Sequence, residues 1–542
     1  MGTWRTWLAC SIGFAVVWFS FLGYRDLLHP DEGRYAEIPR EMLATSDWIT
    51  PHLDGLKYFE KPPLQYWATA LAFELFGASN ATARLWPAAL AFAAVFWTFF
   101  VGRRVFGRET GVLGAIVLAS SLLWVGMGHI LTLDMGLAVL LWFSIGACLL
   151  AQTERDDPVR RRRWMLLAWT ALAAATLSKG PVAPVLAAGT IAIASVWQRD
   201  LDLWRRLHLG LGLCVFLALA APWFVVVGIR NPGFTEFFFL HEHLARYATN
   251  EAGRNGAWWT FFAVVTIGCA PWIGSAVAVL VRPGFAWRGG KGGFDPVRFL
   301  WIWCAFTVVF FTLSRSKLVP YALPVFPPLA LLVGRRLAAR RGLAWDAGSA
   351  VALGALLLAI ATLPIRVSIP DVPREMLDAY RPSVLAGAAL LVGAGIACWT
   401  LRARPLAAAG ALGAVSLVGF QVLLLGFQCF SSVKSSRELA AAIRGDASNG
   451  APVYCVTRYE QALPFYLGRT VDLVHSRGEL DFGLRDDPRR EIVDFATFRR
   501  VWTALDRGVA IFPPEVYRAM ATDDLPMREI HEDLHRVAVA RR

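Results

Sequence analysis

The sequence predicts an α-helical polytopic membrane protein with about 13 transmembrane helices and a small soluble α/β domain at its end. Three observations lead to this fold class: the composition, the spacing of the apolar runs and the placement of the basic residues. Of the 542 residues, 56% are hydrophobic and 18% are charged, and the mean hydropathy is +0.47. A soluble core cannot absorb so much apolar sequence, so we predict many crossings of a bilayer.

Thirteen apolar runs account for the predicted spans. They lie near residues 4–24, 82–102, 110–128, 135–153, 164–178, 181–197, 207–229, 258–281, 299–313, 319–334, 347–365, 383–401 and 406–427. A further run, 64–78, has only 15 residues and contains Glu74. We therefore predict a juxtamembrane helix there, and not a span.

Basic residues cluster in the short gaps between these runs, as in the RRRR sequence at 160–163. Such clusters are typical of cytoplasmic loops, so the net charge of +13 indicates membrane topology and no nucleic-acid partner. The N-terminus is then predicted to be cytoplasmic. With an odd number of spans, the loops 25–63 and 230–257 and the tail face the opposite side.

The tail is less hydrophobic than the rest of the chain. It contains strand-like runs at 452–456 and 508–512 and a helix-like segment at 491–505. We therefore divide the chain into a transmembrane domain, 1–428, and an outward α/β domain, 429–542.

Carboxylates at the outward membrane face are the first candidate site. Asp31 and Glu32 directly follow the first span, and Asp134 lies in a short turn between two later spans. Charge so close to lipid is costly and is usually functional, so we predict catalytic roles for all three. The alternative is that Asp31 and Asp134 merely cap the helices that follow them.

Cations on the same side form the second candidate group, because they run against the positive-inside bias. An anionic ligand such as a membrane-embedded phosphate would require them, with nearby tyrosine hydroxyls as further donors. The predicted substrate-binding residues are Arg34, Lys61, Lys179, Arg246, Tyr35, Tyr58 and Tyr321. Snorkelling to lipid headgroups and an interfacial aromatic belt are the alternatives.

The sequence HEH at 241–243 suggests a metal site. In an irregular segment, His241 and His243 could reach one ion, and Glu60 would complete a nitrogen and oxygen shell suited to Zn²⁺. Two surface histidines in an amphipathic loop are the alternative, since no further metal-binding pattern accompanies them.

Several segments resemble a known family, the lipid A 4-amino-4-deoxy-L-arabinose transferases. The resemblance lies in DEGRYAEIPREML (31–43), DWITPHLDGLKYFEKPPLQYW (47–67), the turn at Asp134, LSKGP (177–181) and SKLVPY (316–321). These enzymes are GT-C membrane glycosyltransferases related to protein O-mannosyltransferases. The similarity covers the transmembrane region, and the C-terminal domain matches less distinctively.

This resemblance implies transfer of an aminopentose from undecaprenyl phosphate to a lipid A phosphate, without a nucleotide cofactor. The reaction would occur at the periplasmic face of a bacterial inner membrane, among membrane lipids, and would confer polymyxin resistance. In the related mannosyltransferases an acidic residue at the position of Asp31 is thought to act as a base. A phosphate acceptor is already ionised, so Asp31 would instead orient a substrate or stabilise oxocarbenium charge.

Two other functions remain open at this stage. Another polyprenyl-phosphate-dependent transferase, for hexose or mannose, would share the same residues. A lipid transporter or flippase would also be polytopic and basic inside, but no internal repeat is visible. We expect Lys61, Arg246 and Tyr321, with Lys179, to converge on the donor phosphate, because Pro62 and Pro63 stiffen the chain beside Lys61.

Overall fold

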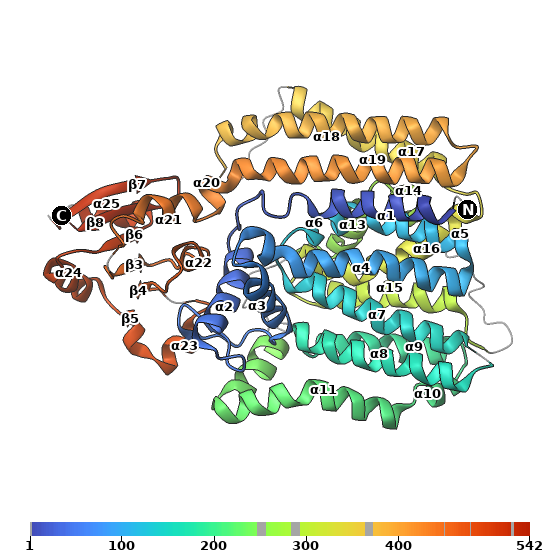
Figure 1. Cartoon of the computed structure of the whole chain (residues 1–542), viewed down its shortest axis with the longest axis horizontal. Helices are drawn as coiled ribbons and strands as arrows, with labels where there is room; N and C mark the ends of the chain where they lie inside the picture. The colour runs from blue at the N-terminus through green and yellow to red at the C-terminus, as the bar shows by residue number, and fades with distance from the viewer. Residues whose placement is uncertain are drawn as a thin grey trace.

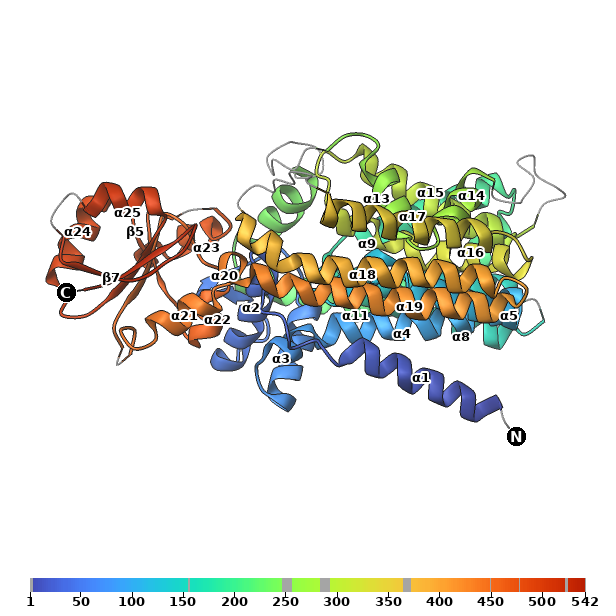
Figure 2. The ribbon, with the colours of Figure 1, turned by 90° about the horizontal axis from the view of Figure 1, so that it is seen from above.

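The protein is a long helical bundle that carries a small cap and, beyond the cap, a sheet domain (Figure 1). The computed structural model describes residues 3–154, 156–245, 256–282, 293–363, 372–448, 450–476, 478–521 and 525–541. The N-terminus lies at the end of the bundle opposite to the sheet domain (Figure 2). The predicted fold class, a polytopic helical membrane protein with a C-terminal α/β domain, is confirmed.

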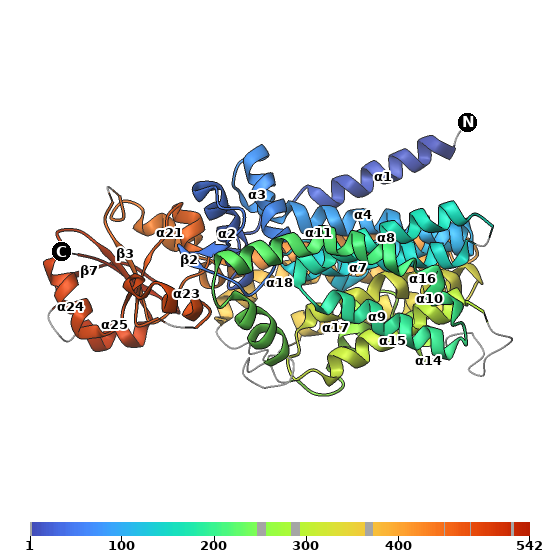
Figure 3. The ribbon, with the colours of Figure 1, turned by 90° about the horizontal axis from the view of Figure 1, so that it is seen from below.

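The bundle consists of helices that run roughly along its length, with α11 extending along one side (Figure 3). Their bounds are α1 (Thr3–Phe19), α4 (Asn80–Phe106), α5 (Arg108–Ala119), α6 (Leu122–Gly128), α7 (Leu133–Thr153), α8 (Pro158–Lys179), α9 (Val182–Trp197), α10 (Asp202–Arg206), α11 (Leu209–Arg230), α13 (Thr260–Gly268), α14 (Ile273–Val281), α15 (Pro296–Leu313), α16 (Phe326–Ala338), α17 (Leu343–Thr362), α18 (Arg374–Thr400) and α19 (Pro405–Gly426). A π-helix, η1 (Glu236–Ala245), follows α11.

The predicted number of about 13 spans is not confirmed. Within the described ranges, seven helices are long and apolar enough to cross a membrane, or eight if α5 and α6, which meet at a 62° bend, form one span. At this bend the hydroxyls of Ser120 and Ser121 donate to carbonyls of the preceding turn.

Prolines divide other predicted runs. Pro271 lies between α13 and α14, and Pro320 and Pro324 confine the start of the run 319–334 to a 3-10 helix, η2 (Val319–Val325). A proline lacks the N–H that continues an α-helix, so each of these apolar runs is split into shorter elements.

Close helix contacts hold the bundle together. A Cβ atom on Gly334 of α16 would lie 2.5 Å from the backbone nitrogen of Gly114 on α5, so only glycine permits this approach. Small residues at crossing points are the usual means of packing helices in a membrane, where burial against lipid gives little driving force. Large buried tryptophans, among them Trp124, Trp142 and Trp303, fill the remaining core.

The cap is formed by α2 (Asp31–Thr45), the hairpin of β1 (His52–Leu53) and β2 (Leu56–Lys57), and α3 (Leu64–Phe76). It lies between the bundle and the sheet domain (Figures 1 and 2). The run 64–78 thus becomes α3 of the cap and is not among the candidate spans, as predicted.

The C-terminal domain is a six-stranded mixed sheet in the order β5-β4-β3-β6-β8-β7. The first four of these strands are parallel, whereas β8 pairs antiparallel with both β6 and β7. The strands are β3 (Val453–Val456), β4 (Asp472–Val474), β5 (Glu491–Ile492), β6 (Val509–Phe512), β7 (Met527–Glu532) and β8 (Val537–Arg541). The helices are α21 (Arg437–Ile443), α22 (Leu463–Leu467), α23 (Asp481–Asp486), α24 (Phe495–Ala504) and α25 (Pro514–Ala521).

Both predicted strands of the tail are present, as β3 and β6. The segment 491–505 is only partly helical, because its first two residues form β5 and pair with β4. Asp494 then starts α24 by accepting a hydrogen bond from the backbone nitrogen of Thr497 at 2.7 Å.

The sheet domain packs tightly on the cap. A Cβ atom on Gly33 of α2 would lie 2.6 Å from Ala462, just before α22. The buried carboxylate of Asp54, in the β1–β2 turn, accepts a hydrogen bond from the backbone nitrogen of Val471 at 2.7 Å. Two short elements, η3 (Phe427–Phe430) and α20 (Ser431–Lys434), join α19 to this domain.

Candidate active site

A cavity of about 640 Å³ lies where the bundle meets the cap. It is bounded by the start of α2, the segment before α3, the N-terminus of α7, the C-terminus of α8, and η1 and η2. The predicted site residues that line it are Asp31, Arg34, Tyr35, Glu60, Lys61, Asp134, Lys179 and Tyr321. The fold thus brings together residues that lie up to 290 positions apart in the sequence.

Asp31 is the first residue of α2, and it does not cap this helix. The N-cap position is occupied by Pro30, and no side chain makes a capping hydrogen bond. The carboxylate lies 3.5 Å from Nη1 of Arg34 and keeps 48% of its side chain exposed on the cavity wall. Asp31 is thus the first helical residue and not the N-cap residue, and its carboxylate is accessible to a ligand.

Asp134 forms an ion pair with Lys179 across the cavity wall. Asp134 is in the first turn of α7, whose N-cap, Thr132, also makes no side-chain capping bond. Lys179 is the last residue of α8, and its Nζ lies 4.7 Å from the ring centroid of Tyr321. The carboxylate at a helix N-terminus and the ammonium group at a helix C-terminus are each favoured by the helix dipole. Both charges are thus held in place although only about an eighth of each side chain is exposed.

Two acceptors hold the ammonium group of Lys61, and one of them belongs to a glutamate that the sequence analysis missed. Its Nζ donates to the carbonyl of Glu60 at 2.7 Å and to Oε2 of Glu242 at 3.1 Å. The Glu242 side chain is only 1% exposed, and it lies on the cavity wall. An acid in the apolar segment FFFLHEHL requires a buried cation, and this was the signal available in the sequence.

Arg34 links the cavity to the sheet domain. Its Nη2 lies 2.5 Å from Oε2 of Glu479, which follows β4. The guanidinium also lies 5.6 Å from the ring centroid of Tyr35 and 6.0 Å from that of Tyr58. Burial raises the pKa of both tyrosines, so their hydroxyls stay protonated and can donate hydrogen bonds. Tyr58 itself is 1% exposed and is not among the residues that line the cavity, and its role in substrate binding stays a prediction.

Glu32 is buried in an ion pair that joins the cap to the bundle, and this position does not support its predicted catalytic role. Its carboxylate accepts hydrogen bonds from Nε and Nη2 of Arg84 at 2.6 and 2.8 Å, and from the backbone nitrogen of Leu131 at 3.0 Å. Arg84 is fully buried in α4, so this ion pair ties the cap to the bundle. Burial opposes ionisation, but the Arg84 guanidinium more than offsets it and holds the pKa of Glu32 below its usual value.

The predicted zinc site is not assembled by the residues that the structure describes. His241 is 57% exposed and stacks on Phe237, with ring centroids 5.4 Å apart. The side chain of His243 and the whole of Arg246 lie outside the described residues. No group of three or more His, Cys, Asp or Glu side chains suited to a metal occurs within the described ranges. Zinc at Glu60, His241 and His243 stays a prediction, which elemental analysis of the purified protein would test.

Much of the remaining wall is apolar, although Ser314 and Ser316 also line the cavity. The apolar part is formed by Leu137, Val182, Val185, Phe239, Phe310 and Phe311, from helices of the bundle and from η1. The cap and the segment before α3 supply Asp31, Arg34 and Lys61, and the bundle supplies Asp134 and Lys179, so charged groups and hydrocarbon surface share one cavity. Such a site suits an amphipathic ligand with an anionic head and a lipid chain.

This combination of a polytopic bundle and a charged cavity at its capped end defines a membrane enzyme that acts on lipid-linked anions. Comparison with known proteins narrows the class to glycosyltransferases. Residues 3–238 match the family described as dolichyl-phosphate-mannose-protein mannosyltransferase, and residues 439–541 match the aminoarabinose transferase C-terminal domain.

Full-length relatives then define the particular family. The chain is 31% identical to the undecaprenyl phosphate-α-4-amino-4-deoxy-L-arabinose arabinosyl transferase of Pseudomonas aeruginosa strain LESB58, over 92% of this chain and 90% of the relative. It is also 31% identical to the enzyme of the same name from Pectobacterium carotovorum, over 91% and 89%. The chain belongs to this family of arabinosyl transferases.

Two solved structures share the whole fold. The crystal structure of ArnT from Cupriavidus metallidurans bound to undecaprenyl phosphate is 33% identical to this chain, with a TM-score of 0.92 over 99% of this chain and 98% of the other. The apo state of the same protein is 32% identical, with a TM-score of 0.91 over the same shares.

Proposed function

We propose that this chain transfers 4-amino-4-deoxy-L-arabinose from undecaprenyl phosphate to a phosphate of lipid A. The observation that carries the proposal is the single cavity in which Asp31, Asp134 and two lysines meet an apolar wall. Carboxylates suit an amino sugar and the positive charge that develops at its C1 atom, whereas lysines suit a phosphate. The names of the relatives, and the undecaprenyl phosphate bound to one of them, support the same chemistry.

The proposed reaction needs no proton transfer to the leaving group. The bond between the sugar C1 and the donor phosphate oxygen breaks, and its electron pair stays on undecaprenyl phosphate. An oxygen of the acceptor phosphate, already ionised near neutral pH, forms the new bond to C1. Catalysis then depends on positioning and on charge stabilisation.

Five of the predicted site residues have proposed roles in this step. Lys61 and Lys179 bind the donor phosphate and offset the charge left on it, and Tyr321 and Arg246 complete this group. Lys61 is held by Glu242 and Lys179 by Asp134. The donor phosphate would therefore bind to ammonium groups whose positions are already fixed by these ion pairs. Asp31 orients the acceptor or the amino group and stabilises the oxocarbenium-like charge.

The site is proposed to face the periplasm. Helix α4 ends and α8 begins with clustered arginines, Arg103 and Arg104 on α4 and Arg160 to Arg163 on α8, at the helix ends away from the cap. The positive-inside rule places these ends in the cytoplasm, together with the N-terminus. The cap, the cavity and the sheet domain would then lie on the periplasmic side of the inner membrane, where modified lipid A would confer polymyxin resistance.

Reconstitution of the purified chain in nanodiscs tests the proposal. With undecaprenyl phosphate-linked aminoarabinose and lipid A, mass spectrometry is expected to detect lipid A that carries the aminopentose. A nucleotide-linked sugar in place of the lipid-linked donor is expected to give no product. Transfer of a hexose from an undecaprenyl phosphate donor, without transfer of the aminopentose, would overturn the proposed sugar and leave the reaction class intact.

A further inference from the structure

A second cavity, of about 720 Å³, lies between the cap and the sheet domain. Its walls come from the segment before α2, the end of α20, the loops that follow β3 and β4, and the β7–β8 turn. It shares Pro30 and Arg34 with the active-site cavity. Its volume lies within the roughly 300 to 1,000 Å³ of small-molecule sites.

The position of this cavity in the sheet favours a ligand site. The chain passes from β3 outward to β4 and β5, and then returns to place β6 on the other side of β3. The order of strands therefore reverses at β3. In open α/β sheets, ligands bind beyond the carboxyl ends of the strands at such a reversal, and the loop after β3 forms one wall of the cavity.

The lining of the cavity is cationic. Lys434 makes no ion pair with any described residue, and Arg458 keeps 57% of its side chain exposed, 3.7 Å from Glu460. His29 and His535 add further nitrogen atoms to the lining. Among the described residues that line it, Glu479 is the one acidic side chain, and it is bound to Arg34 of the same lining.

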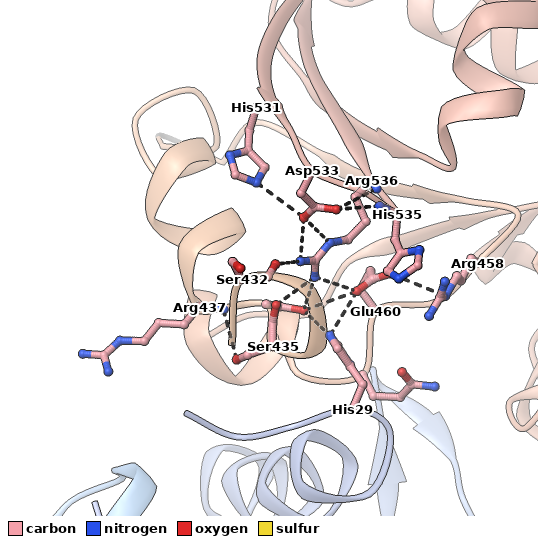
Figure 4. A network of polar contacts seen from close by, with 12 residues as sticks. His29, Ser432, Ser435, Arg437, Arg458, Glu460, His531, Asp533, His535 and Arg536 are labelled. Carbon is pink, nitrogen blue, oxygen red and sulfur yellow. Dashed lines mark hydrogen bonds and ion pairs between the residues drawn. The ribbon is translucent and has the colours of Figure 1, made fainter. Parts of the chain in front are cut away.

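The walls are rigid because a polar network fastens the sheet domain to the end of the bundle (Figure 4). Glu460 lies 3.2 Å from both His29 Nε2 and Arg536 Nη1. Arg536 in turn donates to the carbonyls of Ser435 at 2.9 Å and Ser432 at 2.8 Å. A preorganised site loses little entropy when a ligand binds.

We infer that this interdomain cavity binds the anionic sugar-phosphate headgroup of the acceptor lipid. The inference rests on the proposed function, because lipid A is an acylated, phosphorylated glucosamine disaccharide. When its reacting phosphate lies at Asp31, the rest of the headgroup extends past Arg34 into the second cavity. Lys434 and Arg458 then bind phosphate oxygens.

Acceptor and donor kinetics of the full chain in nanodiscs test this inference. Lys434→Ala and Arg458→Ala are each expected to raise the KM for lipid A about tenfold, since each removes one charge-assisted contact. The KM for the donor is expected to stay unchanged. The matched controls are Lys57→Ala and Arg489→Ala, which remove cations bound to Asp486 and Asp487 outside both cavities. Both controls are expected to keep the wild-type KM for each substrate.

A binding measurement separates this inference from the proposed function. The probe is the de-acylated bisphosphorylated glucosamine disaccharide, titrated against the protein without donor. It is expected to bind the wild type and to bind Lys434→Ala and Arg458→Ala about tenfold more weakly, with inorganic phosphate competing only feebly. This result supports the site even if the transferred sugar proves to be different.

Three outcomes would overturn the inference. One is an unchanged acceptor KM in both variants while the wild type transfers the sugar, which leaves the proposed function intact. Another is equal loss of probe binding in the two control variants. The third is competition by phosphatidylglycerol as strong as that by lipid A, which would make the cavity a general site for anionic lipids.

Discussion

Asp31 and Glu32 are adjacent in the sequence, yet one carboxylate faces the cavity and the other is buried in an ion pair. Glu32 is 2% exposed and fully engaged by Arg84 and two backbone nitrogens, so it holds the cap on the bundle. Asp31 keeps half of its side chain exposed and faces the cavity. Successive residues on a helix point about 100° apart, so one turn of α2 supplies both kinds of carboxylate. We call a buried, ion-paired carboxylate that fastens two parts of the fold, such as Glu32, a brace.

This comparison shows that a carboxylate near a membrane can be stabilised in two ways. A carboxylate can be buried if cations and N–H groups satisfy it completely, as with Glu32. It can also line a polar cavity, as with Asp31 and Asp134. Mutations should separate the two kinds: changes to the braces lower stability, whereas changes to the cavity lower activity and leave the fold intact.

The largest effect is expected for Glu32→Ala. Removal of one member of a buried ion pair leaves Arg84 charged and unpaired, which costs about 3 to 5 kcal/mol. We expect a large drop in the thermal unfolding temperature and loss of detergent-stable protein. Glu32→Gln keeps part of the hydrogen bonding and should be less damaging. Stable Glu32→Ala protein with reduced turnover would instead return Glu32 to the catalytic group.

Asp31→Asn is expected to lower activity about a hundredfold without loss of stability, because it removes a charge that acts on the reacting groups. Single-turnover assays with saturating donor, together with an unfolding scan, measure the two effects separately. Asp134→Asn should also lower activity, and in addition it should release Lys179. Wild-type rates in both variants would remove the two carboxylates from the reaction.

Lys61→Ala is expected to weaken undecaprenyl-phosphate binding about ten- to a hundredfold, since one charge-assisted contact is worth roughly 1.5 to 3 kcal/mol. Lys61→Arg should restore only part of the affinity, because a planar fork replaces a point charge. Affinity is measured on folded protein in nanodiscs, with Lys57→Ala as the matched control. Unchanged lipid-phosphate affinity in Lys61→Ala would leave this lysine as a snorkelling residue.

Much of the site could be predicted from the sequence because charge in apolar surroundings is rare and costly. Asp31, Lys61, Asp134 and Lys179 stand out on this ground alone, and the fold brings all four to one cavity. The partners of these residues were not predictable. Lys61 meets Glu242 across 181 positions, and Arg34 meets Glu479 from another domain. Such pairings depend on packing and leave no local pattern.

The predicted number of about 13 spans is not confirmed, and for two of the apolar runs the sequence contains a local reason. Hydropathy locates apolar runs, but it does not register the prolines that interrupt them, such as Pro271 and Pro320. The β5 strand was missed because two residues have too little pattern to outweigh the helical signal after them. Its pairing with β4 decides its conformation.

Glu460 extends the comparison, because it is a brace like Glu32 but lies at the interface between the sheet domain and the cap. Burial raises the pKa of a carboxyl group, yet the hydrogen bond from His29 and the charges of Arg536 and Arg458 lower the pKa of Glu460 to about 2. A depressed pKa means that Glu460 stabilises the fold fully above pH values near 4.5. This stabilisation is lost as the pH falls toward 2.

The smallest effect is therefore expected for the pH dependence of this brace. Between pH 7 and pH 4 the wild type should lose about 1 kcal/mol of unfolding free energy through Glu460. Other carboxylates titrate in the same range, so the useful quantity is the difference in unfolding free energy between wild type and Glu460→Gln. This difference should stay constant from pH 8 to pH 5 and shrink below pH 4.5. If it is instead independent of pH down to pH 3.5, then Glu460 has the same pKa in the folded and unfolded chains, and its charge does not fasten the sheet domain to the cap.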